Sequence, residues 1–184
     1  GAAVGTSLED LERVKSLISN GVDLIVIDTA HGHSKKVLKI LSKIKKVVNK
    51  TPICVGNIAT GEAASKLYNA GADIIKVGIG PGSICTTRMV AGIGVPQISA
   101  IMEVKRALNK KKIKIISDGG IKFSGDIAKA LAAGADAIMM GSIFAGTDES
   151  PGKKFKYKGK IYKHYRGMGS IGAMSAGSAN RYFQ

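Results

Sequence analysis

Ala70-Gly-Ala-Asp-Ile-Ile-Lys-Val77 is the stretch that decides the fold, because it joins the end of a helix to an apolar strand. The same phrase occurs twice more, as Asn20-Gly-Val-Asp23 and Ala133-Gly-Ala-Asp136, each time after a helical pattern and before an apolar run. Glycine at such a point ends a helix, and apolar, β-branched runs are typical of buried parallel strands. A turn that recurs in this way indicates repeating βαβ units and a parallel sheet.

Five apolar strands follow one another along the chain, and each has a polar or glycine-rich ending. These endings fall at Asp28, Asn57, Gly78, Asp118 and Gly141. The repetition favours a (β/α)8 barrel over a doubly wound sheet, and a barrel carries its chemistry at the carboxyl ends of its strands. Five strands and a strand fragment at the start make only part of a barrel. We therefore expect residues 1–184 to form an incomplete (β/α)8 domain.

Residues 153–184 depart from this pattern. A hairpin is expected around Lys158-Gly159, and a second glycine-dense segment, Tyr165–Met174, follows it. The final Asn180–Gln184 has no terminating signal, so we expect the chain to continue beyond it.

Charge and composition limit the classes of partner. The formal net charge is +15, but the lysines of residues 35–50 alternate with apolar residues at helical spacing, which predicts a solvated helix face. These basic segments contain no aromatic residue, so nucleic-acid binding is not indicated, whereas the charge favours anionic ligands such as phosphates. No apolar run is long enough to predict a membrane span. The only two cysteines, Cys54 and Cys85, make no disulfide framework and fit a reducing cytoplasm.

The loop Gly78-Ile-Gly-Pro-Gly82 follows a strand directly and leads to Ser83, Cys85 and Thr87. It is no dinucleotide fingerprint, since the third glycine comes early and no helix opens at once. Its carbonyl groups could bind a monovalent cation and its N–H groups a phosphate, although a tight loop without a ligand is the alternative. Cys85 is a candidate nucleophile, which an inert thiol would also explain; no acid or histidine within the loop could serve as its base. Cys54 lies in an apolar run and is expected to be a core thiol.

Two other strand endings suit a nucleotide. The carboxylate of Asp118 in Asp118-Gly-Gly120 could accept both hydroxyl groups of a ribose, and Gly141-Ser142 could complete a phosphate site. A simple Asp-Gly turn is the alternative for Asp118. Asp28 is a candidate for a second ribose. His31 and His33 lack a carboxylate or thiol partner and would make a weak metal site.

Together these segments resemble the inosine-5′-monophosphate dehydrogenase family in its bacterial form, over essentially the whole chain. The related guanosine monophosphate reductases share the barrel and the cysteine loop, but Ile121-Lys-Phe-Ser124 and the segment after Tyr165 favour the dehydrogenase. The motifs that carry the resemblance are Gly78-Ile-Gly-Pro-Gly-Ser-Ile-Cys-Thr-Thr-Arg88, Gly92-Ile-Gly-Val-Pro-Gln97, Ser117-Asp-Gly-Gly-Ile-Lys-Phe-Ser-Gly-Asp126, Met140-Gly-Ser142, Ala145-Gly-Thr-Asp-Glu-Ser-Pro151 and Tyr165-Arg-Gly-Met-Gly-Ser170.

The resemblance implies NAD-dependent oxidation of inosine 5′-monophosphate (IMP) to xanthosine 5′-monophosphate, the committed step of guanine nucleotide biosynthesis. The reaction would pass through a covalent thioimidate on Cys85, with Thr87 helping to position the chemistry. The residues implied for IMP are Ser83, Asp118, Gly119, Gly120, Gly141, Ser142, Tyr165, Arg166, Gly167, Met168 and Gly169. Those implied for NAD are Asp28, Thr29, Ala30, Gly78, Ile79 and Gly80, and those for potassium are the backbone carbonyls of Gly80, Gly82 and Cys85.

The resemblance also implies a cytoplasmic homotetramer and segments outside this chain. These are the first barrel strands and any regulatory CBS modules before Gly1, and a flap beyond Gln184 whose arginine activates water. The 184-residue chain alone is therefore not expected to turn over substrate. Two alternatives remain: an NADPH-dependent reductase that converts GMP to IMP, and a non-catalytic nucleotide or nucleic-acid binder, which the net charge suggests.

Overall fold

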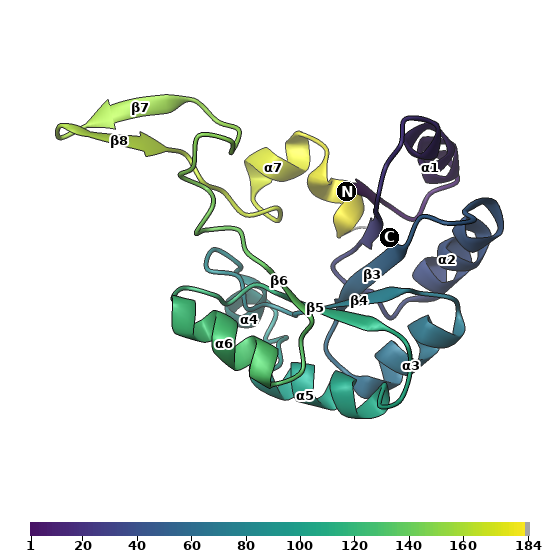
Figure 1. Ribbon diagram of the computed structural model, residues 1–184. Helices are drawn as coiled ribbons and strands as arrows, with labels where there is room; N and C mark the ends of the chain where they lie inside the picture. The colour runs from purple at the N-terminus through teal and green to yellow at the C-terminus, as the bar shows by residue number, and fades with distance from the viewer. Residues whose placement is uncertain (183–184) are drawn as a thin grey trace.

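The structure, a computed structural model, describes residues 1–182 and is built on one sheet of six parallel strands (Figure 1). Each strand pairs with the next one along the chain, so the sheet order is the sequence order. The strands are β1 (Ala2–Val4), β2 (Ile25–Asp28), β3 (Ile53–Ile58), β4 (Ile74–Val77), β5 (Lys114–Asp118) and β6 (Ala137–Met139).

The sheet is curled, and helices that connect successive strands lie along its outer face (Figure 1). They are α1 (Glu9–Ser19), α2 (Lys35–Val47), α3 (Gly61–Asn69), α5 (Gln97–Ala107) and α6 (Ser124–Ala132). Parallel strands in chain order with helices on one face are the arrangement of a (β/α)8 barrel. The predicted fold, an incomplete barrel of five to six βα units, is confirmed.

The recurring Gly-x-Asp turns end three of these helices in the same way. Gly21, Gly71 and Gly134 have positive φ angles of 76°, 102° and 115°. In each turn the glycine N–H donates to the carbonyl three residues back, and the next N–H donates to the carbonyl five residues back. This is the Schellman motif, which favours glycine because a Cβ atom would strain the left-handed conformation.

The aspartate of the turn fastens neighbouring strands together. Asp73 precedes β4 and accepts a hydrogen bond from the N–H of Ile53, at the start of β3, at 2.9 Å. Asp136 precedes β6 and accepts one from the N–H of Ile115 in β5, also at 2.9 Å. In two of its three occurrences, at Asp73 and Asp136, the repeated phrase therefore ends a helix and also sets the position of the adjacent strand.

The lysine-rich helix α2 is amphipathic, as the spacing predicted. Val37, Ile40, Leu41 and Ile44 are buried against the sheet, whereas most of its lysines are exposed. Ser34 caps the helix by accepting a hydrogen bond from the N–H of Val37. Part of the positive charge, six of the 28 basic residues, thus belongs to a helix whose polar face is solvated.

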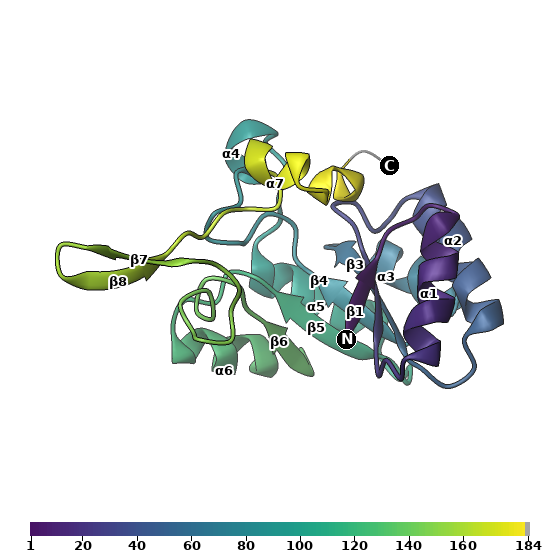
Figure 2. The same cartoon turned by 90° about the horizontal axis from the view of Figure 1, so that it is seen from above.

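The segments that follow β4 and β6 form a hairpin and short helices, and only the hairpin was predicted from the sequence. The expected hairpin is present and projects away from the sheet (Figure 2). Three short helices were not predicted. The hairpin consists of β7 (Lys154–Tyr157) and β8 (Lys160–Lys163). The three short helices are α4 (Thr87–Val90), α7 (Ile171–Ser175) and the 3-10 helix η1 (Ser178–Arg181). Across residues 1–182, none of the helices has the length and apolar character needed to span a membrane.

Candidate active site

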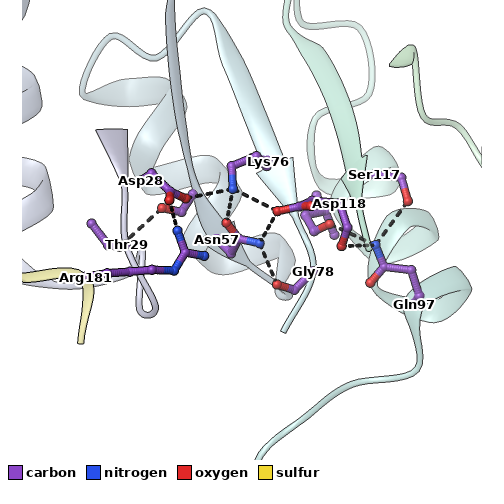
Figure 3. A network of polar contacts seen from close by, with 11 residues as sticks. Asp28, Thr29, Asn57, Lys76, Gly78, Gln97, Ser117, Asp118 and Arg181 are labelled. Atoms are coloured by element: carbon purple, nitrogen blue, oxygen red, sulfur yellow. Dashed lines mark hydrogen bonds and ion pairs between the residues drawn. The ribbon is translucent and has the colours of Figure 1, made fainter. Parts of the chain in front are cut away.

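Polar side chains from β2, β3, β4 and β5 meet at the carboxyl end of the sheet (Figure 3). Their centre is Lys76, whose side chain is only 3% exposed. Its ammonium nitrogen lies 2.8 Å from Asp28 Oδ1, 2.8 Å from Asp118 Oδ2 and also contacts Asn57 Oδ1. Three acceptors thus meet the three N–H donors of one buried cation, which satisfies its hydrogen-bonding capacity.

Strand register explains how Lys76 reaches Asp28, which lies two strands away. Gly56 of β3 pairs with Asp28 on one side and with Lys76 on the other. A Cβ atom at Gly56 would lie 2.7 Å from the Cβ atom of Lys76, closer than real Cβ contacts. Because Gly56 has no side chain, it leaves room between Asp28 and Lys76 for the lysine side chain to reach the aspartate.

Asn57 and Gln97 fix the backbone around this cluster. Asn57 Nδ2 donates to Asp118 Oδ2 at 2.9 Å and to the carbonyl of Gly78 at 2.8 Å. Gln97, the first residue of α5, donates through Nε2 to the carbonyl of Val77 at 2.8 Å and to Ser117 Oγ at 3.1 Å. The ends of β3, β4 and β5 are therefore joined by side-chain amides.

Cys85 is exposed at the end of the glycine loop. Its N–H donates to the carbonyl of Gly82 at 3.0 Å, and its Sγ atom lies 3.2 Å from Thr87 Oγ1, in hydrogen-bonding contact. Cys54, by contrast, is fully buried in β3, as predicted, and burial raises the pKa of its thiol to about 12. Only Cys85 is thus accessible to a substrate.

The glycine loop also packs against the endings of β5 and β6. Ser83 Oγ donates to Ser142 Oγ at 2.8 Å. A Cβ atom at Gly119 would meet Pro81 at 3.1 Å and the backbone nitrogen of Gly82 at 3.2 Å, so the two loops are in close contact. The structure therefore brings together predicted IMP residues that are far apart in the sequence.

The glycine-dense segment after the hairpin reaches the same region. A Cβ atom at Gly141 would lie 2.5 Å from the Tyr165 hydroxyl, and one at Gly167 would lie 3.3 Å from the carbonyl of Ile84. An open cleft of about 1330 Å³ lies beside these residues. It is lined by Met140, Gly141, Phe144, Ala145, Thr147, Glu149, Ser150, Pro151, Gly152, His164, Tyr165 and Arg166.

The predicted NAD residues after β2 lie next to η1. The guanidinium group of Arg181 forms an ion pair with Asp28, and the N–H of Ala30 donates to the Arg181 carbonyl at 3.0 Å. Burial lowers the pKa of Arg181 from its ordinary value. Thr29 is fully buried, and its hydroxyl donates to the carbonyl of Gly56 at 3.2 Å. Its side chain therefore supports the strand ends rather than lining an open surface.

The histidines give no support to a metal site. The ring centroids of His31 and His33 are 6.5 Å apart. Within residues 1–182, no three His, Cys, Asp or Glu side chains group so as to hold a metal ion. Of the three carbonyls predicted to bind potassium, that of Gly82 accepts from the N–H of Cys85, whereas those of Gly80 and Cys85 accept no hydrogen bond from the described residues.

Comparison with known proteins decides the family. A family model described as the IMP dehydrogenase / GMP reductase domain matches residues 1–184. The chain belongs to the IMP dehydrogenase / GMP reductase family. Proteins named inosine-5′-monophosphate dehydrogenase in Rhizobium tropici, Aquifex aeolicus and Bacillus subtilis are each 58% identical to it over its whole length. The chain spans 37% of the first of these relatives and 38% of the other two.

Family membership confirms the resemblance that the motifs carried, whereas the roles of single residues stay predictions. From the sequence, Asn57 was named only as a strand ending and Gln97 only as part of a motif, and neither Lys76 nor Arg181 was named as a site residue. The structure places all four at the site. The sequence contained one indication of this buried network: Lys76 is a charged residue within the apolar strand Ile74–Val77. Such a residue is rarely buried unless its charge is paired.

Proposed function

We propose that the chain forms part of the catalytic barrel of an enzyme that oxidises IMP to xanthosine 5′-monophosphate with NAD. The observation that carries the proposal is the exposed thiol of Cys85 next to Thr87, on a glycine loop that also brings Ser83 to Ser142. A nucleophile beside a cluster of hydroxyl and N–H groups suits a substrate that carries a phosphate. The 58% identity to dehydrogenases supports the same activity.

In the proposed reaction the Cys85 thiolate adds to C2 of the hypoxanthine ring. The hydride on C2 then passes to NAD, and water releases the product from the thioimidate on Cys85. The water oxygen becomes the new oxygen on C2, and the thiol is regenerated. Thr87 would assist through its hydroxyl, which already contacts Sγ.

The remaining roles are those that the family resemblance implies. Asp118 would bind the ribose of IMP, and Asp28, Thr29 and Ala30 would meet NAD, with the nicotinamide near Gly78, Ile79 and Gly80. The phosphate would lie at Ser83, Gly120, Gly141, Ser142 and Tyr165, and the edge of the base at Met168 and Gly169. Gly119, Arg166 and Gly167 would also contact IMP. The Gly80, Gly82 and Cys85 carbonyls would hold potassium, which would stabilise the loop.

The reductase is the second candidate, because the matching family model covers both activities. It would use the same cysteine on GMP and release ammonia with NADPH as the reductant. The dehydrogenase is favoured because the relatives at 55–58% identity that we compared carry the dehydrogenase name.

The test is to incubate the full-length protein with IMP and NAD and to follow NADH. NADH formation that requires potassium and is lost in Cys85→Ala supports the proposal. Ammonia release from GMP with NADPH, without NADH formation from IMP, would establish the reductase instead. Sedimentation velocity of the same sample tests the homotetramer, and fractionation of cells tests the cytoplasmic location.

A further inference from the structure

Lys76 connects carboxylates that come from different parts of the site. Asp28 ends β2 and Asp118 ends β5, and each has one oxygen 2.8 Å from the same ammonium nitrogen (Figure 3). The two carboxylates are 23% and 22% exposed, so a ligand can reach both, whereas the lysine between them is 3% exposed. Lys76 is therefore too buried for extensive contact with a ligand, but it can affect ligand binding through the two aspartates that it holds.

Both carboxylates keep acceptor positions that the contacts described above do not use. Asp118 uses Oδ2 for both Lys76 and Asn57, and its Oδ1 accepts no hydrogen bond from the described residues. Asp28 uses Oδ1 for Lys76 and Oδ2 for Arg181, which leaves a further lone pair on each oxygen. Each carboxylate is held in place on one side and can accept from a sugar hydroxyl on the other.

We propose that Lys76 is a positioning residue that couples the two nucleotide sites by holding Asp118, on the IMP side, and Asp28, on the NAD side, to one buried cation. This inference rests on the proposed function, which assigns the two aspartates to different ribose rings. Members of a shared buried network are not independent, because each ion pair polarises and restrains the next. Coupling between two binding sites is reciprocal, so both nucleotides are affected when the link is removed.

The effect of removing the charge follows from electrostatics. An uncharged side chain at this position removes the ion pair between Lys76 and Asp118 and one of the two ion pairs of Asp28, which keeps Arg181. The two carboxylates then lie close together without the cation between them, and like charges repel at low dielectric. Both aspartates then move away from the positions in which they accept from ribose. A residue that served one site alone would not produce this paired effect.

The experiment compares Lys76→Met and Lys76→Arg in the full-length protein, with kcat and both KM values measured for IMP and NAD. Lys76→Met is expected to raise both KM values about tenfold or more, since it removes charge-assisted hydrogen bonds from both carboxylates. Lys76→Arg keeps the cation and is expected to recover most of that loss in both substrates. Lys114→Met is the matched control, because it breaks a lysine–aspartate pair of 2.9 Å at the far, exposed edge of the same sheet. It is expected to leave both KM values unchanged.

The coupling has a second readout that keeps Lys76 in place. Asp28→Asn should raise the KM for IMP as well as that for NAD, although Asp28 is assigned to NAD, and this measurement decides the matter if Lys76→Met does not fold. Wild-type activity with IMP and NAD, combined with variants that change only one of the two KM values or neither, would overturn the inference while leaving the proposed function intact. A wild-type protein that forms no NADH from IMP overturns the proposed function itself and the inference with it.

Discussion

The Sγ atom of Cys85 lies 3.2 Å from the hydroxyl oxygen of Thr87, the first residue of α4. A hydroxyl group can accept a hydrogen bond from a thiol and donate one to a thiolate. Thr87 is half-buried, whereas Cys85 is exposed, so the hydroxyl is held by the fold beside a thiol that a substrate can approach. This pair is the part of the site where the first chemical step would begin.

The first prediction concerns this hydroxyl. Thr87→Val keeps the shape of the side chain but removes the donor to the thiolate, and a hydrogen bond to a charged group is worth about 1.5–3 kcal/mol. We expect kcat to fall by at least about tenfold and alkylation of Cys85 by iodoacetamide at neutral pH to slow. Thr87→Ser, which keeps the hydroxyl, is the control and should retain most of the activity. Equal rates for the Val and Ser variants would show that the hydroxyl has no role in activating the thiol.

The second prediction concerns the pair formed by Ser83 and Ser142, which lie 2.8 Å apart on different strand endings. If both serve one phosphate, Ser83→Ala and Ser142→Ala should each raise the KM for IMP several-fold. The double variant should cost less than the sum of the two single effects, because residues in one network are not additive. Inosine, which has no phosphate, should not distinguish wild type from these variants. Ser42→Ala, at an exposed position of helix α2, is the control and should change neither value.

Local signals allowed much of the fold to be predicted. Strand β4 and helix α3 have the predicted bounds, because a glycine turn, an apolar run or a capping threonine defines each of them within a few residues. The short helices α4 and α7 were missed, since segments of four and five residues show no helical period.

The polar network was not predicted because its contacts are long-range. Lys76 contacts residues that are 48, 42 and 19 positions away in the sequence. No local pattern encodes such pairs; only the register of β2, β3, β4 and β5 brings them together. The Ser83–Ser142 contact spans 59 positions and was not itself predicted, although the family resemblance had assigned both serines to the phosphate of IMP.

The third prediction concerns Gly56, which separates Lys76 from Asp28 in the strand register. A Cβ atom there would lie 2.7 Å from the Cβ atom of Lys76, so Gly56→Ala should push β4 away from β3. We expect the free energy of unfolding to fall by about 1–3 kcal/mol, as for other overpacked cores, and turnover to fall with it. Chemical denaturation of the purified full-length protein measures the first effect.

Gly125→Ala is the matched control for this substitution. Gly125 lies near the start of α6, and nothing lies within 4 Å of an added Cβ atom. Alanine favours the helix by about 1 kcal/mol relative to glycine, so this variant should be as stable as wild type or more stable. If both variants were equally stable, space at Gly56 would not be the constraint that the register indicates.

The fourth prediction concerns the stability of the protein at alkaline pH. Burial raises the pKa of the Cys54 thiol from 9.0 to about 12. In the unfolded chain the thiol ionises at its lower, ordinary pKa, whereas in the folded protein it stays protonated. The stability from this group is therefore fully present below pH 9 and is lost as the pH rises toward 12. The contribution of one such group to the slope is at most about 1.4 kcal/mol per pH unit.

Chemical denaturation across this alkaline range should show the effect as a difference between variants. Cys54→Ala lacks the thiol, so its stability should fall less steeply with pH than that of wild type, whatever the lysines contribute to both proteins. Cys85→Ala removes the other, exposed cysteine and should keep the wild-type slope, which makes it the control. Identical slopes for the wild type and Cys54→Ala would mean that this thiol ionises as readily in the folded protein as in the unfolded chain. The Cys54 side chain is 0% exposed, and no hydrogen bond from the described residues reaches its thiol. A thiolate there would have neither water nor a donor to stabilise it. We therefore expect the steeper slope for the wild type.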